Sequence, residues 1–199
     1  MKWDQAPKAA AEAVLEFDDG ARELFAPVAD SAAGAVLHPI SKLADQPQLR
    51  AISAALIVAG IFARNQRLTR AGSRMIMAHE AATFAKDTIK TDVERTRPRS
   101  AGSKRDAKPR KGKRQAKEVT SFPSGHTSGA IAVARAFSRE FPEYAAPALG
   151  AAAFLALLQV VRDAHYPTDV LAGVAVGLAA EKGTDLLWSA AIGDPLADD

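Results

Sequence analysis

Cysteine is absent from the 199-residue sequence, so no disulfide can form and no thiolate is available as a nucleophile or metal ligand. Aromatic residues make up only 6% of the chain, and no segment alternates apolar and polar residues with the period of two that half-buried strands show. Alanine-rich apolar segments at helical spacing dominate instead. The sequence therefore predicts an all-α fold, a bundle of about five or six helices in a single domain over residues 1–199.

An uninterrupted apolar secretory core is also lacking, because MKWDQAPKAAAEAVLEFDDG carries acidic residues where that core would lie. We therefore do not expect a soluble protein exported by signal-peptide cleavage. Neither the apolar run over residues 51–63 nor the uncharged run over 145–161 reaches the roughly 20 residues of a typical membrane span. With a mean hydropathy of −0.08, these runs favour a bundle partly embedded in a membrane, or held at the surface of an inner or plasma membrane.

The hydrophobic pattern gives the approximate positions of the helices. They are expected over residues 69–96, 125–141, 145–161 and 168–188, with two shorter pieces inside 8–37 that are separated at Asp19-Gly20 and at Pro27. The first of the longer helices is amphipathic.

Positive charge is concentrated in one region. Residues 90–118 hold twelve Lys or Arg and four Asp or Glu, against fourteen and nineteen in the rest of the chain. Such a region attracts phosphates, lipid headgroups or nucleic acid. Because residues 99–119 combine this charge with Pro, Gly and Ser, we predict a flexible loop there. Nucleic acid is not an expected partner, since no aromatic residue lies between Arg99 and Lys117.

Three polar groups stand beside the apolar helices. Lys90 and Arg97 are seven residues apart, so a helix would bring both to nearly the same face, with Pro98 marking its end. Alone, this pattern is also typical of a solvated basic helix end.

Ser124, Gly125 and His126 precede an apolar helix, where free backbone N–H groups can bind an anion. A simple N-cap by Ser124 is compatible with that role. His165 and Asp169 are four apart around Pro167, so the carboxylate can orient the imidazole, although such a pair is also a frequent structural cap. Together the groups supply a nucleophile, a proton donor and phosphate-binding donors.

The segments KTDVERTRP, PSGH and HYPTDVLAG resemble, in order, the three signature motifs of the type 2 phosphatidic acid phosphatase superfamily. This superfamily also includes bacterial acid phosphatases and vanadium haloperoxidases. The resemblance spans residues 90–173 and implies that His165 attacks phosphorus to form a phosphohistidine while Asp169 holds its ring. It further implies that His126 protonates the leaving oxygen, that Lys90, Arg97, Ser124 and the Gly125 amide bind the phosphoryl oxygens, and that no metal or other cofactor is required.

The third motif departs from the family pattern. Leu158 and Gln159 stand where the family has Ser-Arg, so the second phosphate-binding arginine is missing. Gln159 would donate one neutral hydrogen bond, which costs about 1.5–3 kcal/mol of binding relative to a bidentate charged pair. Arg162, three residues on, is the candidate substitute.

The leading hypothesis is a metal-independent phosphatase that acts on a lipid-borne phosphate monoester or diphosphate. One alternative is a soluble acid phosphatase or haloperoxidase with the same pocket. Another is a catalytically weakened protein whose basic segment binds anionic lipid or nucleic acid. The basic loop and the arginines after residue 63 give conflicting indications of the membrane face.

Overall fold

Helices account for nearly all of the regular structure in the computed structural model, which describes residues 8–101, 108–112 and 120–193. The α-helices are α1 (Lys8–Ala29), α2 (Ala32–Ser41), α3 (Gln46–Phe62), α4 (Gln66–Asp92), α5 (Gly125–Glu140), α6 (Ala145–Val161) and α7 (Pro167–Ile192). Short 3-10 helices occupy Lys42–Ala44, Pro98–Ser100 and Pro142–Tyr144, and two-residue strands β1 (Val93–Glu94) and β2 (Arg110–Lys111) pair antiparallel. The predicted all-α class is confirmed.

The predicted count of five or six helices is wrong, since the described ranges contain seven α-helices. The predicted break of the first helix is also wrong, because α1 runs through Gly20 and Pro27. A glycine costs a helix only about 1 kcal/mol, which its alanine- and glutamate-rich neighbours can offset. Pro27 lies two residues before the end of α1 at Ala29, so the one hydrogen bond that its missing N–H costs and the clash of its ring affect only the last turns of the helix.

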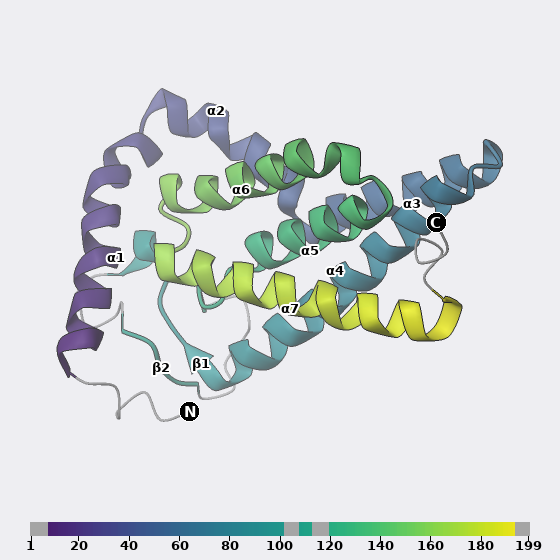
Figure 1. Ribbon diagram of the computed structural model, residues 1–199. Helices are drawn as coiled ribbons and strands as arrows, with labels where there is room; N and C mark the ends of the chain where they lie inside the picture. Colours follow the sequence, from purple (N-terminus) through teal and green to yellow (C-terminus); the bar gives the residue numbers. More distant parts are fainter. Residues whose placement is uncertain (1–7, 102–107, 113–119, 194–199) are drawn as a thin grey trace.

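The bundle is built around α5, which contacts α3, α4, α6 and α7. Figure 1 shows these helices running roughly along one direction, with α1 crossing the end of the bundle where α6 ends and α7 begins. Contacts of α1 with α6 and α7 agree with that view. The strands β1 and β2 lie near the same end, so several chain segments converge there.

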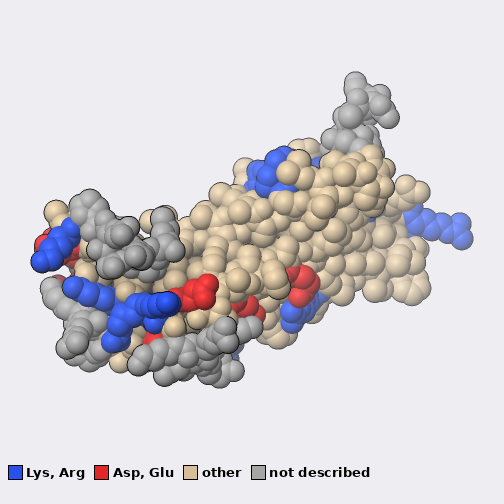
Figure 2. Space-filling view, turned by 90° about the horizontal axis from the view of Figure 1, so that it is seen from below, with Lys and Arg blue, Asp and Glu red and all other residues tan. Residues whose placement is uncertain are grey.

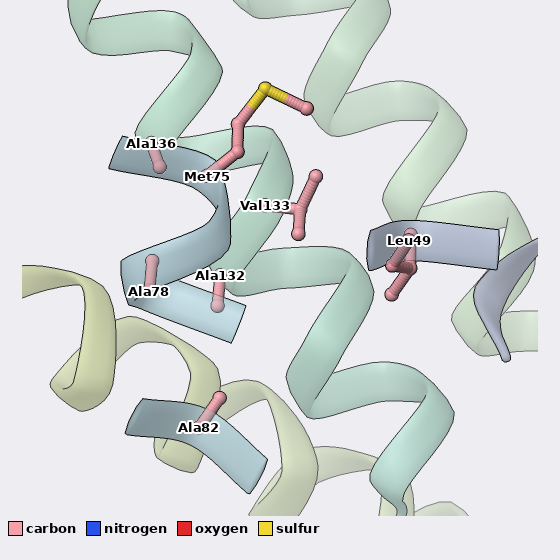
Figure 3. Close-up of a cluster of buried hydrophobic side chains, with 7 residues drawn as sticks. All are labelled: Leu49, Met75, Ala78, Ala82, Ala132, Val133 and Ala136. Atoms are coloured by element: carbon pink, nitrogen blue, oxygen red, sulfur yellow. The ribbon is translucent and has the colours of Figure 1, made fainter. Parts of the chain in front are cut away.

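Small side chains fill most of the core. One buried cluster, drawn in Figure 3, joins α3, α4 and α5 through Leu49, Met75, Ala78, Ala82, Ala132, Val133 and Ala136. Gly173 and Gly177 of α7 lie against α5, where an added Cβ would come within 2.7 Å and 2.6 Å of the carbonyl oxygens of Ser124 and Ser128. Small residues at the contacts therefore let the helices approach closely.

Many larger apolar side chains point outward instead. Phe62 is 85% exposed and Phe84 76% exposed, and leucines of α6 and α7 are likewise on the surface. Most of the charged atoms visible in Figure 2 gather toward its left end, and the long body is mainly tan. This arrangement leaves an apolar outer surface of the kind that contacts lipid or another protein.

One segment, Pro142–Val161, is long and apolar enough to cross a membrane by length and composition, and α3 is a shorter apolar helix. Ion pairs stabilise the bundle further along its length. Arg74 of α4 lies 3.0 Å from Glu140 of α5 and 2.9 Å from Asp185 of α7, so these three helices are joined through a buried cation.

The close contact of α7 with α5 predicts opposite effects for two glycine substitutions. Gly177→Ala places a methyl group against the Ser128 carbonyl oxygen, and we expect it to lower the free energy of unfolding by about 1–3 kcal/mol. Gly183→Ala, with nothing within 4 Å of the new Cβ, should raise it by up to about 1 kcal/mol through helix propensity. Thermal unfolding of both variants in detergent measures the difference. Equal effects would contradict the close packing described for α5 and α7.

Candidate active site

The predicted polar groups meet at the end of the bundle that α1 crosses. They surround a cavity of about 430 Å³. Its lining residues are Ala44, Asp45, Gln46, Pro47, Lys86, Asp87, Lys90, Arg97, Gly125, His126 and His165. Four of the sequence-predicted positions and the backbone of Gly125 thus share one pocket, although they are up to 75 residues apart in the chain.

Lys90 and Arg97 reach this pocket by a route that the sequence did not predict. The helix α4 ends at Asp92, before the predicted end, so Arg97 is not on the same helix face as Lys90. The chain turns through β1, and Arg97 then adopts an extended backbone just before Pro98. Lys90 donates a hydrogen bond of 2.7 Å to the Thr120 carbonyl oxygen, which fixes the ammonium group at the pocket.

The residues after Pro123 form the predicted helix start. Ser124 is the N-cap of α5, and its buried hydroxyl oxygen accepts the Thr127 backbone N–H. The cap hypothesis for Ser124 is confirmed, and its side chain does not line the pocket. Gly125, the first helical residue, does line it. The pocket therefore lies at the positive end of the α5 dipole.

His165 lies in the turn between α6 and α7, and its side chain is almost fully buried. Arg97 Nη1 is 3.2 Å from His165 Nε2. A guanidinium can only donate, so Nε2 is the acceptor and the proton of the neutral ring is on Nδ1. Nδ1 faces Asp169 Oδ2 at 3.7 Å, longer than a hydrogen bond, and has no hydrogen-bond partner among the described residues.

Burial lowers the pKa of His165 to about 4, and the positive charges of Arg97 and Lys90 add to this effect, while Asp169 opposes it. The ring is therefore neutral at physiological pH. Burial of Asp169 favours its protonated form, but the contacts with His165 and the charge of Arg95 hold its pKa below the ordinary value. A neutral imidazole beside a carboxylate is the protonation state that a nucleophilic histidine requires.

His126, in the first turn of α5, also lines the cavity. The ring centres of His126 and His165 are 6.4 Å apart. Its Nε2 is 2.5 Å from Oδ1 of Asp45, a residue that the sequence did not single out because it precedes α3, 81 residues away. Burial lowers the pKa of His126, and the carboxylate of Asp45 opposes that shift. The pKa of His126 therefore lies below its ordinary value, and Asp45 is the contact that favours its protonated form.

Lys86 is a second residue of the pocket, after Asp45, that the sequence did not predict. It lies one helical turn before Lys90, is 7% exposed, and packs against Gly125, where an added Cβ would lie 3.0 Å from its Cδ. Its ammonium group is 2.8 Å from Asp87. Together Lys86, Lys90 and Arg97 place three cations beside one helix N-terminus, and burial together with Arg97 and Lys86 lowers the pKa of Lys90 to about 8. The signal in the sequence that could have indicated Lys86 is its spacing of four residues from Lys90, which places both lysines on one face of a helix.

Gln159 and Arg162 do not line the pocket. Gln159 is fully buried, and its amide nitrogen donates to the Leu155 carbonyl oxygen within α6. Arg162 contacts the Ser41 hydroxyl and His38 of α2, and it lines a neighbouring cavity with Arg99. Within the predicted flexible loop at 99–119, residues 102–107 and 113–119 lie outside the described residues.

Comparisons with known proteins agree with this geometry. Residues 54–187, more than half of the chain, match the model of the PAP2 superfamily. The lipid A 1-phosphatase of Rhizobium etli is 44% identical over 57 residues, which cover 29% of this chain and 25% of the relative. The enzyme of the same name from Porphyromonas gingivalis is 39% identical over 64 residues, 30% of this chain and 14% of the relative.

The chain thus matches a quarter or less of the length of these relatives, and no solved structure matches. The family match contains all three motifs whose residues converge on the pocket. This chain therefore belongs to the PAP2 superfamily.

Proposed function

We propose that the protein is a metal-independent phosphatase that hydrolyses a lipid-borne phosphate monoester or diphosphate through a phosphohistidine at His165. The observation that carries this proposal is the position of Nε2 of a neutral, buried histidine in a pocket with Lys90 and Arg97. A second histidine, His126, lines the same pocket, and its ring centre is 6.4 Å from that of His165. An anionic phosphoryl group fits the charge of this site, because the cations there would otherwise repel one another.

In the first step of the proposed reaction, the Nε2 lone pair of His165 attacks phosphorus and the bond to the leaving oxygen breaks. Arg97 donates its hydrogen bond to a phosphoryl oxygen in place of His165 Nε2, and this change of acceptor frees the Nε2 lone pair. His126 gives its proton to the leaving oxygen. The ring of His165 becomes a cation with its proton on Nδ1, and the negative charge of Asp169 stabilises it.

In the second step, His126, now neutral, takes a proton from water while the water oxygen attacks phosphorus. The bond between phosphorus and Nε2 breaks, and inorganic phosphate leaves. Lys90, Arg97 and the Gly125 N–H hold the equatorial oxygens throughout. Ser124 supports this cradle as the cap of α5, whereas Gln159 and Arg162 take part only if they reorient from their present positions.

Two observations support a lipid as the carrier of the phosphate and membrane association of the protein. The outer surface of the bundle is apolar, as the exposure of Phe62 and Phe84 illustrates, and one segment is long enough to span a bilayer. The matched relatives are named lipid A 1-phosphatases, and these names point to a phosphate carried by a lipid. Lipid A phosphates therefore join phosphatidic acid, phosphatidylglycerol phosphate and isoprenyl diphosphates as candidate substrates.

The proposal predicts that phosphate release requires both histidines of the pocket and does not require a metal ion. We expect the protein in detergent, with EDTA present, to release phosphate from at least one of phosphatidic acid, a prenyl diphosphate and lipid A. His165→Ala and His126→Ala should each lower kcat by at least about a hundredfold, because each removes one chemical role. His79→Ala is the matched control, since His79 is a buried histidine of α4 outside the pocket. Activity that survives in His165→Ala, or that EDTA abolishes, would contradict the proposal.

The lowered pKa of Lys90 predicts a pH dependence of substrate binding. Below about pH 8 its ammonium group is charged and attracts phosphate, and above that pH the free enzyme loses this charge. We expect KM to rise with pH above 8, approaching about tenfold per unit, because a phosphate monoester is already a dianion there. Lys90→Arg keeps its charge and should flatten this rise. A KM of the wild type that is constant between pH 7 and 10 would show that Lys90 does not bind the phosphoryl group.

A further inference from the structure

We propose that Arg95 and Asp18 are positioning residues for the catalytic pair, and that α1 completes the active site by supplying Asp18. This inference rests on the proposed role of His165 as the nucleophile. Neither residue lines the pocket, so both would act through Asp169.

Arg95 is the link between three segments of the chain. It is 1% exposed and follows β1. Its Nη1 donates to Asp169 Oδ1 and to Thr168 Oγ1, both at 2.8 Å, and its guanidinium lies 3.9 Å above the centre of the Tyr166 ring. Because Oδ1 of Asp169 is held by Arg95 and Oδ2 accepts the Tyr166 backbone N–H at 3.0 Å, the carboxylate is fixed with Oδ2 toward His165 Nδ1.

Asp18 holds Arg95 from the opposite side. Its Oδ2 accepts from Arg95 Nη2 at 2.6 Å, and its Oδ1 accepts the backbone N–H of Thr168 in the first turn of α7 at 3.1 Å. The Thr168 hydroxyl also donates to Asp18. This carboxylate therefore orients Arg95 and caps the helix that carries Asp169.

The burial pattern of α1 indicates that the contact of Asp18 with the bundle does not serve to bury apolar surface. All residues of α1 are described, and Asp18 is the only one of them that is buried. Apolar residues of α1 such as Phe17 and Leu24 are exposed instead. A buried carboxylate has to be paired to offset its lost hydration, so polar contacts rather than apolar burial define where α1 meets the bundle at this point. Arg22 adds a hydrogen bond of 3.3 Å to the Ala101 carbonyl oxygen.

The charges of the cluster also suit the reaction. A buried Arg95 beside Asp169 alone would form a neutral pair, and the cation that develops on His165 would lack compensation. With Asp18 present, the two carboxylates and the guanidinium carry a net charge of −1. That charge balances the imidazolium ring of the phosphohistidine, and the three side chains that carry it are buried, where charges interact strongly.

The test compares Asp18→Asn with Glu16→Gln, which removes the same charge from an exposed site on α1. We expect Asp18→Asn to lower kcat about tenfold to a hundredfold with KM little changed, because the phosphoryl-binding residues are untouched. Asp18→Glu should recover part of the loss, and Glu16→Gln should behave as the wild type. A rise in KM at constant kcat, or unchanged kinetics, would overturn the proposal.

Two further measurements keep the test decisive. Thr168→Val removes the hydroxyl between Asp18 and Arg95 without a change of charge, and it should also lower kcat. This variant takes the place of Asp18→Asn if Asp18→Asn does not fold. Nitrogen-15 NMR of labelled histidine, without substrate, should show that the Nδ1 resonance of His165 shifts between the wild type and the variant that folds, because Nδ1 faces the carboxylate that Asp18 and Arg95 hold. An identical Nδ1 chemical shift in both would overturn the positioning role. Absence of phosphatase activity in the wild type would count against the proposed function alone.

Discussion

A buried guanidinium between two buried carboxylates is the interaction on which the site depends. Arg95 bridges Asp169 and Asp18, and each of these three side chains is at most 1% exposed. Because separating any one of them would leave an unpaired charge in the interior, the segment after β1, the start of α7 and the middle of α1 are held in one arrangement. Asp169 is thereby oriented, and through it His165. The cations of the pocket lie on the other side of His165, so one ring stands between a negative cluster and a positive one.

Each cation of the positive cluster has a local partner within the protein. Lys90 donates to the Thr120 carbonyl oxygen, Lys86 lies beside Asp87, and Arg97 donates to His165. The Thr120 carbonyl oxygen and the neutral His165 ring, which accept from Lys90 and Arg97, are weaker acceptors than a phosphoryl dianion would be. The same arrangement keeps His165 neutral, since nearby positive charge and burial both disfavour its protonation. Binding and nucleophilicity thus have a common electrostatic cause.

Local rules predicted the parts of the molecule that local sequence determines. The all-α class, the start of α5 with Ser124 as its cap, and the turn that carries His165 follow from periodicity, capping and proline placement. The sequence did not reveal Asp18, Arg95 or Asp45, whose partners lie 73 to 150 residues away. The end of α4 was also mispredicted, because the pairing of β1 with β2 ends the helix at Asp92. These features depend on contacts between distant segments of the chain, and the spacing of residues in the sequence does not indicate such contacts.

Transfer of the phosphoryl group to His165 would leave a phosphohistidine that can be trapped. A substrate labelled with phosphorus-32 and carrying a good leaving group would be mixed with His126→Ala, which should form the intermediate faster than it hydrolyses it, and quenched in alkali. We expect a label that is stable in alkali, lost in acid, and located on the peptide containing His165. Turnover without any such label, or a label that persists in His165→Ala, would contradict it.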